Sequence, residues 1–275
     1  MPPSKFIMLA FLWAMVSAAP ANAQNGSIDG EEPDMFEGSE IFACPDGKYQ
    51  SGCDIADVEK AILSDASSFS NIGQNCLYAV KANCSVIAAG QINISSTKTQ
   101  FHWQHLSLQP KDGPHVEMMI LFTNENEPEF FSAMQVEGFF DAPILVRDDD
   151  RAILHVPARN RGLGSADQIF YSTGNSWNVT TAYNIERQVN KLLPQNFQLA
   201  SPIFFNLREA SAFSLVRRHN DAGCCATGGT VNIDFEVRDY VLEVSQIAFN
   251  ETIPVGNPKY TSSGDSENHT EGGSK

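Results

Sequence analysis

Short apolar segments of strand length recur along most of this chain, and they restrict its fold more than any other feature. Between residues 97 and 254 they alternate with turn sequences, such as those at 111–114 and 174–175. The predicted strands are 101–108, 116–123, 132–138, 144–147, 152–158, 169–173, 177–180, 197–207, 212–217, 229–237 and 241–249. Many short strands at regular spacing are typical of antiparallel sheets. We therefore predict a mainly β fold, α+β overall, with a β-rich domain at 97–254.

Helical periodicity occurs in fewer places. Apolar positions between 54 and 69 recur at helical spacing, with Asp54 as a candidate N-cap. Residues 183–193 carry one apolar stripe that stops at Pro194. Residues 75–89 fit either a second helix or the approach to a strand, and the pattern does not separate the two. We therefore predict a small helical, disulfide-containing subdomain at 42–95 and one further helix at about 183–193.

A secretory signal peptide is predicted at residues 1–23. Lys5 is followed by an apolar run at 6–18 and by small residues up to Ala23, after which we expect cleavage. The run is short for a helix that crosses a bilayer, so a retained anchor is the less favoured alternative. No later run is long enough, so we expect an exported protein with no transmembrane anchor after cleavage.

The two ends of the expected mature chain differ in composition from its middle. Residues 24–41 carry six acidic side chains and no basic one, and residues 255–275 are mostly small and polar. Such segments cannot bury enough apolar surface to become ordered. We predict a disordered acidic leader at 24–41 and a disordered tail at 255–275.

The charge balance excludes one large class of function. The chain has 18 Lys and Arg residues against 33 Asp and Glu residues, a net charge of -15. Cleavage after Ala23 removes one Lys and leaves 17 basic and 33 acidic residues, a net charge of -16. Nucleic-acid binding depends on clustered Lys and Arg, so we expect no nucleic-acid partner. An acidic protein favours encounters with basic partners instead.

The cysteines indicate an oxidising compartment. All six follow the expected cleavage site: Cys44, Cys53, Cys76, Cys84, Cys224 and Cys225. Their spacing favours local Cys44–Cys53 and Cys76–Cys84 bridges, which leaves the adjacent Cys224 and Cys225 to pair with each other. That last bridge would be strained and easily reduced, since neighbouring Cα atoms lie only about 3.8 Å apart. In the alternative, both Cys224 and Cys225 are bonded to the N-terminal cysteines.

The candidate catalytic and metal-binding motifs are weak. His102 and His105 would point to opposite faces of a strand, and the acidic turn at 148–150 lacks the Gly and distal Glu of a calcium loop. Ser165 lacks the strand–Gly-x-Ser-x-Gly–helix context of a hydrolase nucleophile. A redox pair is normally separated by two residues, unlike Cys224 and Cys225. We therefore predict no catalytic residue, no metal site and no cofactor.

The most distinctive motif lies at 221–229, where the two glycines permit positive φ angles. It comprises Asp221, Cys224, Cys225, Thr227, Gly228 and Gly229. Together with the motifs that precede it, it resembles a family of exported bacterial proteins of unknown function, whose signature is Asp-x-x-Cys-Cys-Pro-Thr-Gly-Gly. The resemblance covers about residues 116–249, and Ala226 stands where the family usually has Pro. It implies a periplasmic or secreted bacterial protein that is β-rich and has no assigned catalytic residues.

These observations predict a non-catalytic, envelope-associated binding or interaction protein with an envelope or extracellular ligand. The competing hypothesis is an enzyme, either a thiol-disulfide redox protein or a hydrolase that uses the Cys224–Cys225 region. Binding is favoured because no nucleophile, base and oxyanion site can be assembled from the sequence.

Overall fold

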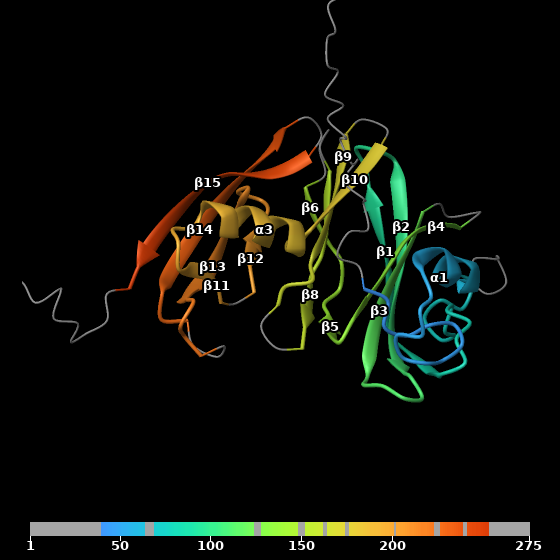
Figure 1. Ribbon diagram of the computed structural model, residues 1–275. Helices are drawn as coiled ribbons and strands as arrows, with labels where there is room; N and C mark the ends of the chain where they lie inside the picture. The colour runs from blue at the N-terminus through green and yellow to red at the C-terminus, as the bar shows by residue number, and fades with distance from the viewer. Residues whose placement is uncertain are drawn as a thin grey trace, which may run out of the picture. The chain divides into compact units, whose positions relative to one another are not determined.

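The computed structural model describes residues 40–63, 69–123, 128–147, 152–161, 164–173, 176–200, 202–222, 226–238 and 241–252. The predicted signal peptide, residues 24–39 of the leader and the tail at 255–275 lie outside this part of the chain. The described residues form antiparallel sheets together with helices α1 (Ile55–Ala61) and α3 (Ala182–Leu192), as Figure 1 shows. The predicted mainly β fold is confirmed.

Three sheets and one short ribbon organise the described strands. The first sheet has the order β1 (Asn83–Ile94), β2 (Thr99–Gln109), β3 (Val116–Thr123), β4 (Glu129–Val136). The second has the order β10 (Ser176–Thr181), β9 (Gln168–Thr173), β7 (Ile153–Val156), β6 (Ile144–Arg147). The third has the order β11 (Phe197–Leu199), β13 (Ser211–Arg218), β14 (Gly229–Arg238), β15 (Val241–Glu251), with β12 (Phe204–Asn206) also beside β13. The ribbon pairs β5 (Gly138–Phe140) with β8 (Ala158–Asn160).

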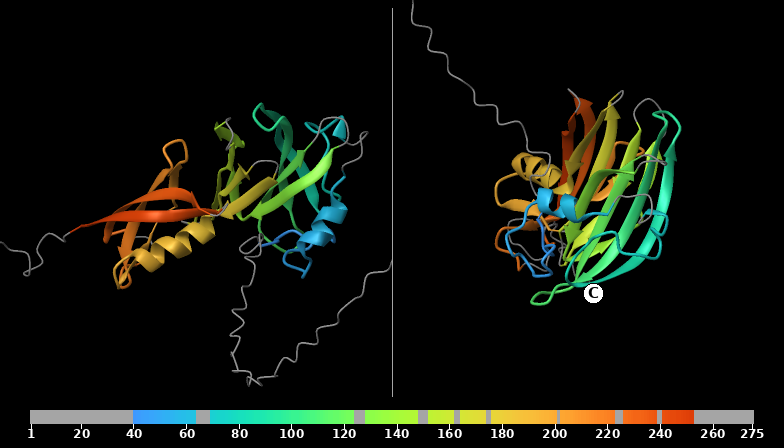
Figure 2. Two further views of the ribbon diagram at one scale, coloured as in Figure 1. Left: turned by 90° about the horizontal axis from the view of Figure 1, so that it is seen from above. Right: turned by 90° about the vertical axis from the view of Figure 1, so that its right-hand side faces the viewer.

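The central strands of the first and second sheets are buried on both faces. Along β3, Met118 and Ile120 pack under the N-terminal segment, whereas Met119 and Leu121 contact the second sheet. Along β9, alternate residues likewise face the first sheet and the core that contains α3 and the third sheet. This two-sided burial explains why the strand at 116–123 is a continuous apolar run and does not alternate with polar residues. Figure 2 shows α3 along the third sheet and the N-terminal segment on the first.

Both described helices have the predicted positions, and their capping explains their limits. Asp54 and Asp57 form a capping box at the start of α1. Thr181 caps α3 by accepting a hydrogen bond from the Asn184 N–H at 3.3 Å, and Pro194 follows its C-cap, Leu193. Helix α1 ends at Ala61, well before the limit of 69 that the apolar spacing allowed, because the chain then makes a β-bridge.

Three predicted strands are each divided in two by the structure. Pro157 separates β7 from β8, and Pro202 lies between β11 and β12. Proline has no backbone N–H to donate to a ladder, so these runs cannot continue as single strands. The third divided run is 132–138, where β4 ends at Val136 and β5 begins at Gly138.

The segment 42–95 is less helical than the sequence predicts. Residues 83–94 form β1, which pairs with β2 across the expected boundary at 95–97. A register shift lies between Val86 and Ala88. Val86 therefore contacts the core under the N-terminal segment, whereas Ala88 and Ile92 contact the core between the first two sheets. A bulge changes which face each residue occupies, so neither a strand nor a helix period could be recognised there.

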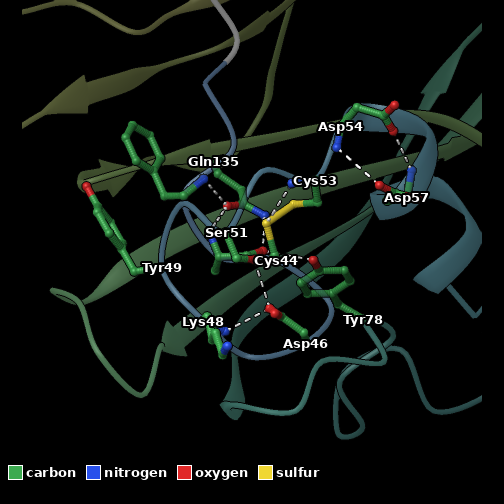
Figure 3. The surroundings of a disulfide bond; sticks show 12 residues. Cys44, Asp46, Lys48, Tyr49, Ser51, Cys53, Asp54, Asp57, Tyr78 and Gln135 are labelled. Atoms are coloured by element: carbon green, nitrogen blue, oxygen red, sulfur yellow. Dashed lines mark hydrogen bonds between the residues drawn. A yellow bond between two sulfur atoms is a disulfide. The ribbon is translucent and has the colours of Figure 1, made fainter.

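Two buried glutamine side chains attach the N-terminal segment to the first sheet. The Gln135 Oε1 atom accepts hydrogen bonds from the N–H groups of Phe42 at 2.9 Å and Ala43 at 2.7 Å, and its Nε2 donates to the Ala43 carbonyl at 3.1 Å (Figure 3). Gln104 on β2 accepts from the Leu77 N–H at 2.9 Å and donates to backbone carbonyls, including that of Asn75 at 2.8 Å. Each amide thus satisfies backbone groups that burial would otherwise leave unpaired.

Disulfides close the two loops that these glutamines hold. Cys44 is bonded to Cys53 and Cys76 to Cys84, which confirms the local pairings and rules out bridges from these four cysteines to the C-terminal pair. Closing a loop removes conformations from the unfolded chain and so stabilises the folded one. Cys224 and Cys225 lie outside the described residues.

No helix within the described ranges is long and apolar enough to cross a membrane.

We predict that Gln135→Ala lowers the free energy of unfolding by about 2–4 kcal/mol, since it leaves buried backbone groups of Phe42 and Ala43 unpaired. Gln100→Ala is the matched control, because the Gln100 side chain is only half-buried and its amide makes one long hydrogen bond, to Gln91 at 3.4 Å. It should change the stability by less than about 0.5 kcal/mol. Urea unfolding at neutral pH measures both, and equal effects would contradict the anchoring role of Gln135.

Candidate functional site

A cavity of about 480 Å³ lies beside the start of α3. Its walls come from the N-terminal segment, the end of β4, the chain between β8 and β9, and the first two turns of α3. The polar lining includes Glu40, Gln135, Asn160, Ser165, Gln168 and Glu186. The apolar lining includes Phe42, Met134, Val136, Ala166, Ala182 and the ring of Tyr183. The lining is thus about equally polar and apolar, and the volume is sufficient for a small molecule.

Glu186 is the chemically distinctive residue of this cavity. Helix α3 buries Ala182, Ile185 and Val189 against the sheets, and Glu186 follows the buried stripe directly, so its carboxyl is drawn partly out of water. Burial raises the pKa of Glu186 to about 7. A hydrogen bond from the Ser165 backbone lowers this pKa slightly, and the nearby Asp167 carboxylate raises it. At neutral pH this carboxyl can therefore either donate or accept a proton.

The wall behind Glu186 is held by buried polar contacts. The Ser165 hydroxyl accepts a hydrogen bond from the Ile203 N–H at 2.6 Å. Asp167 is 2.7 Å from the Nε2 atom of His155, and its backbone carbonyl accepts from the Ala182 N–H at the start of α3. These contacts tie the chain before β9 to the helix and to the third sheet. They fix the shape of the cavity wall.

His155 does not share the cavity with Ser165. His155 is not among the cavity's lining residues, and its ring packs edge-on against Phe205 with centroids 5.8 Å apart. The described lining contains no histidine, cysteine, lysine or arginine. Ser165 thus shares the cavity with Glu186, and no histidine belongs to the described lining.

Both ends of the distinctive 221–229 motif are fastened. The Thr227 Oγ1 atom lies 2.8 Å and 2.7 Å from the two carboxylate oxygens of Asp221, and the Arg218 N–H donates to Asp221 at 2.6 Å. These hydrogen bonds, that from Thr227 foremost, hold the pKa of Asp221 below its usual value. The Arg218 guanidinium bonds the Thr227 carbonyl and pairs with Glu251 at 2.9 Å. Asp221 and Thr227 thus form a clamp across the loop, whose Cys224 and Cys225 lie outside the described residues.

The two glycines of the motif allow the chain to run close to its neighbours. Gly229 has a φ of +132°, and a Cβ atom there would lie 2.0 Å from the Asn250 carbonyl oxygen. A Cβ on Gly228 would lie 2.8 Å from the Val216 carbonyl oxygen. Any larger residue would push the loop away from β13 and β15.

The histidines considered from the sequence lie on opposite faces of β2, as predicted. His102 packs against Phe69, and His105 packs against Phe140. The His105 Nε2 atom is 2.7 Å from Glu117, which also accepts the Phe140 N–H at 2.9 Å, so this pair connects β2, β3 and β5. Within the described ranges, no group of three or more His, Cys, Asp or Glu side chains could hold a metal ion. The acidic turn at 148–150 lies outside those ranges.

Sequence reasoning missed Glu186, Asp167 and the cavity itself. The one local signal was a carboxyl placed directly after the apolar stripe of a helix, at Ile185-Glu186. That signal is common on surface helices. The cavity that Glu186 lines is assembled from residues up to 146 positions away along the chain, such as Glu40.

No protein-family model, no curated protein and no solved structure matches this chain. The class that the fold and the site define is therefore a structural one: a disulfide-linked, mainly antiparallel β protein with a polar cavity beside its longer described helix. The resemblance of the 221–229 motif to exported bacterial proteins stays a prediction.

We predict that Glu186→Gln stabilises the protein above pH 7 and has little effect near pH 4. The folded state holds the Glu186 proton up to about pH 7, whereas the unfolded chain releases it near 4.5. The stability contributed by this group is thus fully present below 4.5 and is lost as the pH rises to 7. The Gln variant does not lose this stability, so its free energy of unfolding should exceed that of the wild type by about 1–3 kcal/mol above pH 7. Thermal unfolding at pH 4 and 8 measures it, with Glu59→Gln on exposed α1 as the control; a pH-independent difference would contradict the buried carboxyl.

We predict that Gly229→Ala lowers the free energy of unfolding by at least about 2 kcal/mol, through the positive φ and the contact with Asn250. Gly73→Ala is the control, because a Cβ there meets nothing within 4 Å and its φ is not positive. Its effect should stay within about 1 kcal/mol. Melting temperatures of the two variants measure this difference. An equal, small shift for both would contradict the requirement for glycine at position 229.

Proposed function

We propose that this protein is an exported, non-catalytic binding protein of the bacterial envelope, and that the cavity beside α3 is its ligand site. The observation that carries the proposal is the half-buried Glu186 carboxyl in a cavity of about 480 Å³. No ion pair among the described residues includes Glu186. A partly desolvated carboxyl without a cation partner weakens the folded state, and residues that do so are concentrated at functional sites.

The proposed compartment is supported by two independent features. The apolar run at 6–18 with small residues up to Ala23 is typical of a secretory signal peptide. The Cys44–Cys53 and Cys76–Cys84 bridges are typical of proteins that fold outside a reducing cytosol. The resemblance of the 221–229 motif to exported bacterial proteins further supports a periplasmic location.

A thiol-disulfide function at Cys224 and Cys225 is the alternative, and the clamp between Asp221 and Thr227 is the observation that favours it. The clamp joins the two ends of the segment that contains both cysteines. The charge of Arg218, which could activate a thiolate, is however already paired with Glu251 and lies near Asp221. A disulfide-reductase assay separates the two functions: activity that disappears in Cys224→Ser would overturn the binding proposal.

The binding proposal is tested on the wild-type chain labelled with ¹³C in its alanine methyl groups. Ala166 and Ala182 line the cavity, whereas Ala56 and Ala79 are exposed elsewhere. We expect small-molecule fragments to shift the first two methyl signals saturably and to leave the other two unchanged. Ala166→Phe should abolish these shifts by occupying the cavity, and Ala56→Phe should preserve them.

Two results would contradict the proposal. Fragments that bind without moving the Ala166 and Ala182 signals would place the ligand site elsewhere. A fragment set that produces no saturable shift in either methyl would mean that the cavity is only a packing defect.

A further inference from the structure

We propose that the cavity beside α3 binds an organic cation, a ligand with a protonated amine, and that Glu186 is its counter-ion. This inference rests on the proposed function of the same cavity and adds the chemical class of the ligand. Neither the composition nor the 221–229 motif points to this residue.

The charged side chains of the described lining are acidic. Glu186 and Glu40 are both carboxylates, and the described lining contains no lysine, arginine or histidine. Asp167 lies close enough behind the wall to raise the pKa of Glu186. An anionic ligand would therefore meet two acidic side chains and no basic one in the described lining, at a site partly shielded from water, where like charges repel strongly. A cation would find attraction on the same surfaces.

The uncharged part of the lining includes aromatic residues. Phe42, Tyr183 and Met134 share the wall with Glu186, and the Arg187 guanidinium lies over one face of the Tyr183 ring. A cation is attracted to the face of an aromatic ring, and this attraction grows when water is excluded. The Gln135 amide is already bonded to the N-terminal segment, so it offers little to a ligand. The lining thus supplies negative charge and aromatic surface, a combination that suits alkylammonium groups.

Charged groups also lie on the elements that pack around Glu186. Asp167 faces Glu186 from the chain before β9 and is itself 2.7 Å from His155, and Glu40 belongs to the N-terminal segment. On α3 itself, the Arg187 guanidinium lies over the Tyr183 ring at 5.7 Å. Burial raises the pKa of Glu186 to about 7.

A cation pairs with the ionised carboxylate, so below pH 7 each binding event must release the proton of Glu186. The affinity should therefore weaken about tenfold for each pH unit below 7 and become constant above pH 8. A neutral ligand that accepts a hydrogen bond from the protonated carboxyl would show the opposite trend.

The test compares three probes of one shape: n-butylammonium, butan-1-ol and butyrate. Each is titrated into the wild-type protein at pH 8 while the Ala166 and Ala182 methyl signals are followed. We expect n-butylammonium to bind at least tenfold more tightly than the other two. Glu186→Gln should weaken its binding at least tenfold, Glu40→Gln less because Glu40 is exposed, and Glu59→Gln not at all.

The outcomes separate this inference from the function on which it rests. Equal or tighter binding of butan-1-ol or butyrate, or a Kd for n-butylammonium that does not change between pH 6 and 8, would overturn the cation and leave a ligand site. Failure of all three probes and of the wider fragment set would overturn the ligand site as well. The pH series needs no variant, so a poorly folded Glu186→Gln does not prevent the decision. With binding established, Nα-acetyl-lysinamide distinguishes the sources: tighter binding than n-butylammonium indicates a lysine side chain of a protein partner, and weaker binding a free amine.

Discussion

The hydrogen bonds of the Gln135 amide are the interaction on which the rest of this structure depends. They bond Phe42 and Ala43 to β4 much as a neighbouring strand would, although no ladder forms there. The anchored segment covers the outer face of the first sheet, whose core would otherwise be exposed. Gln135 and Phe42 also line the cavity, so the same contacts that complete the fold place one wall of the site. Stability and site geometry are therefore coupled at this residue.

The cavity lies where three packed regions approach each other without filling the space. Phe42 belongs to the core beneath the N-terminal segment, Met134 to the core between the first and second sheets, and Ala182 begins the helix that packs on the third. Sheets that are buried on both faces leave few positions for a polar side chain. Glu186 occupies one of them at the edge of a buried stripe, where its raised pKa records the loss of water. A carboxyl so placed weakens the fold, and a cationic ligand would offset that effect.

The strands, both described helices and the local disulfides could be predicted because each depends on neighbouring residues. The Asp54 cap, the Pro194 stop and the short loops of Cys44–Cys53 and Cys76–Cys84 are examples. The strand β1 is the exception and could not be predicted, since its bulge changes the face that each residue occupies. The site could not either: Ser165 was judged from its local motif, whereas its partner Ile203 and the covering residue Phe42 come from distant parts of the chain. Burial that is assembled from distant segments leaves no periodic signal.

We infer that the fold removes the Glu186 carboxyl from water and leaves it open to a cation. The most direct measurement is the pH titration of the Glu186 side-chain carboxyl by ¹³C NMR, without ligand and with saturating n-butylammonium. We expect a midpoint near 7 in the free protein and a lower midpoint in the complex, because a bound cation stabilises the ionised form. A midpoint close to 4.5 in the free protein, or one that n-butylammonium leaves unchanged, would contradict it.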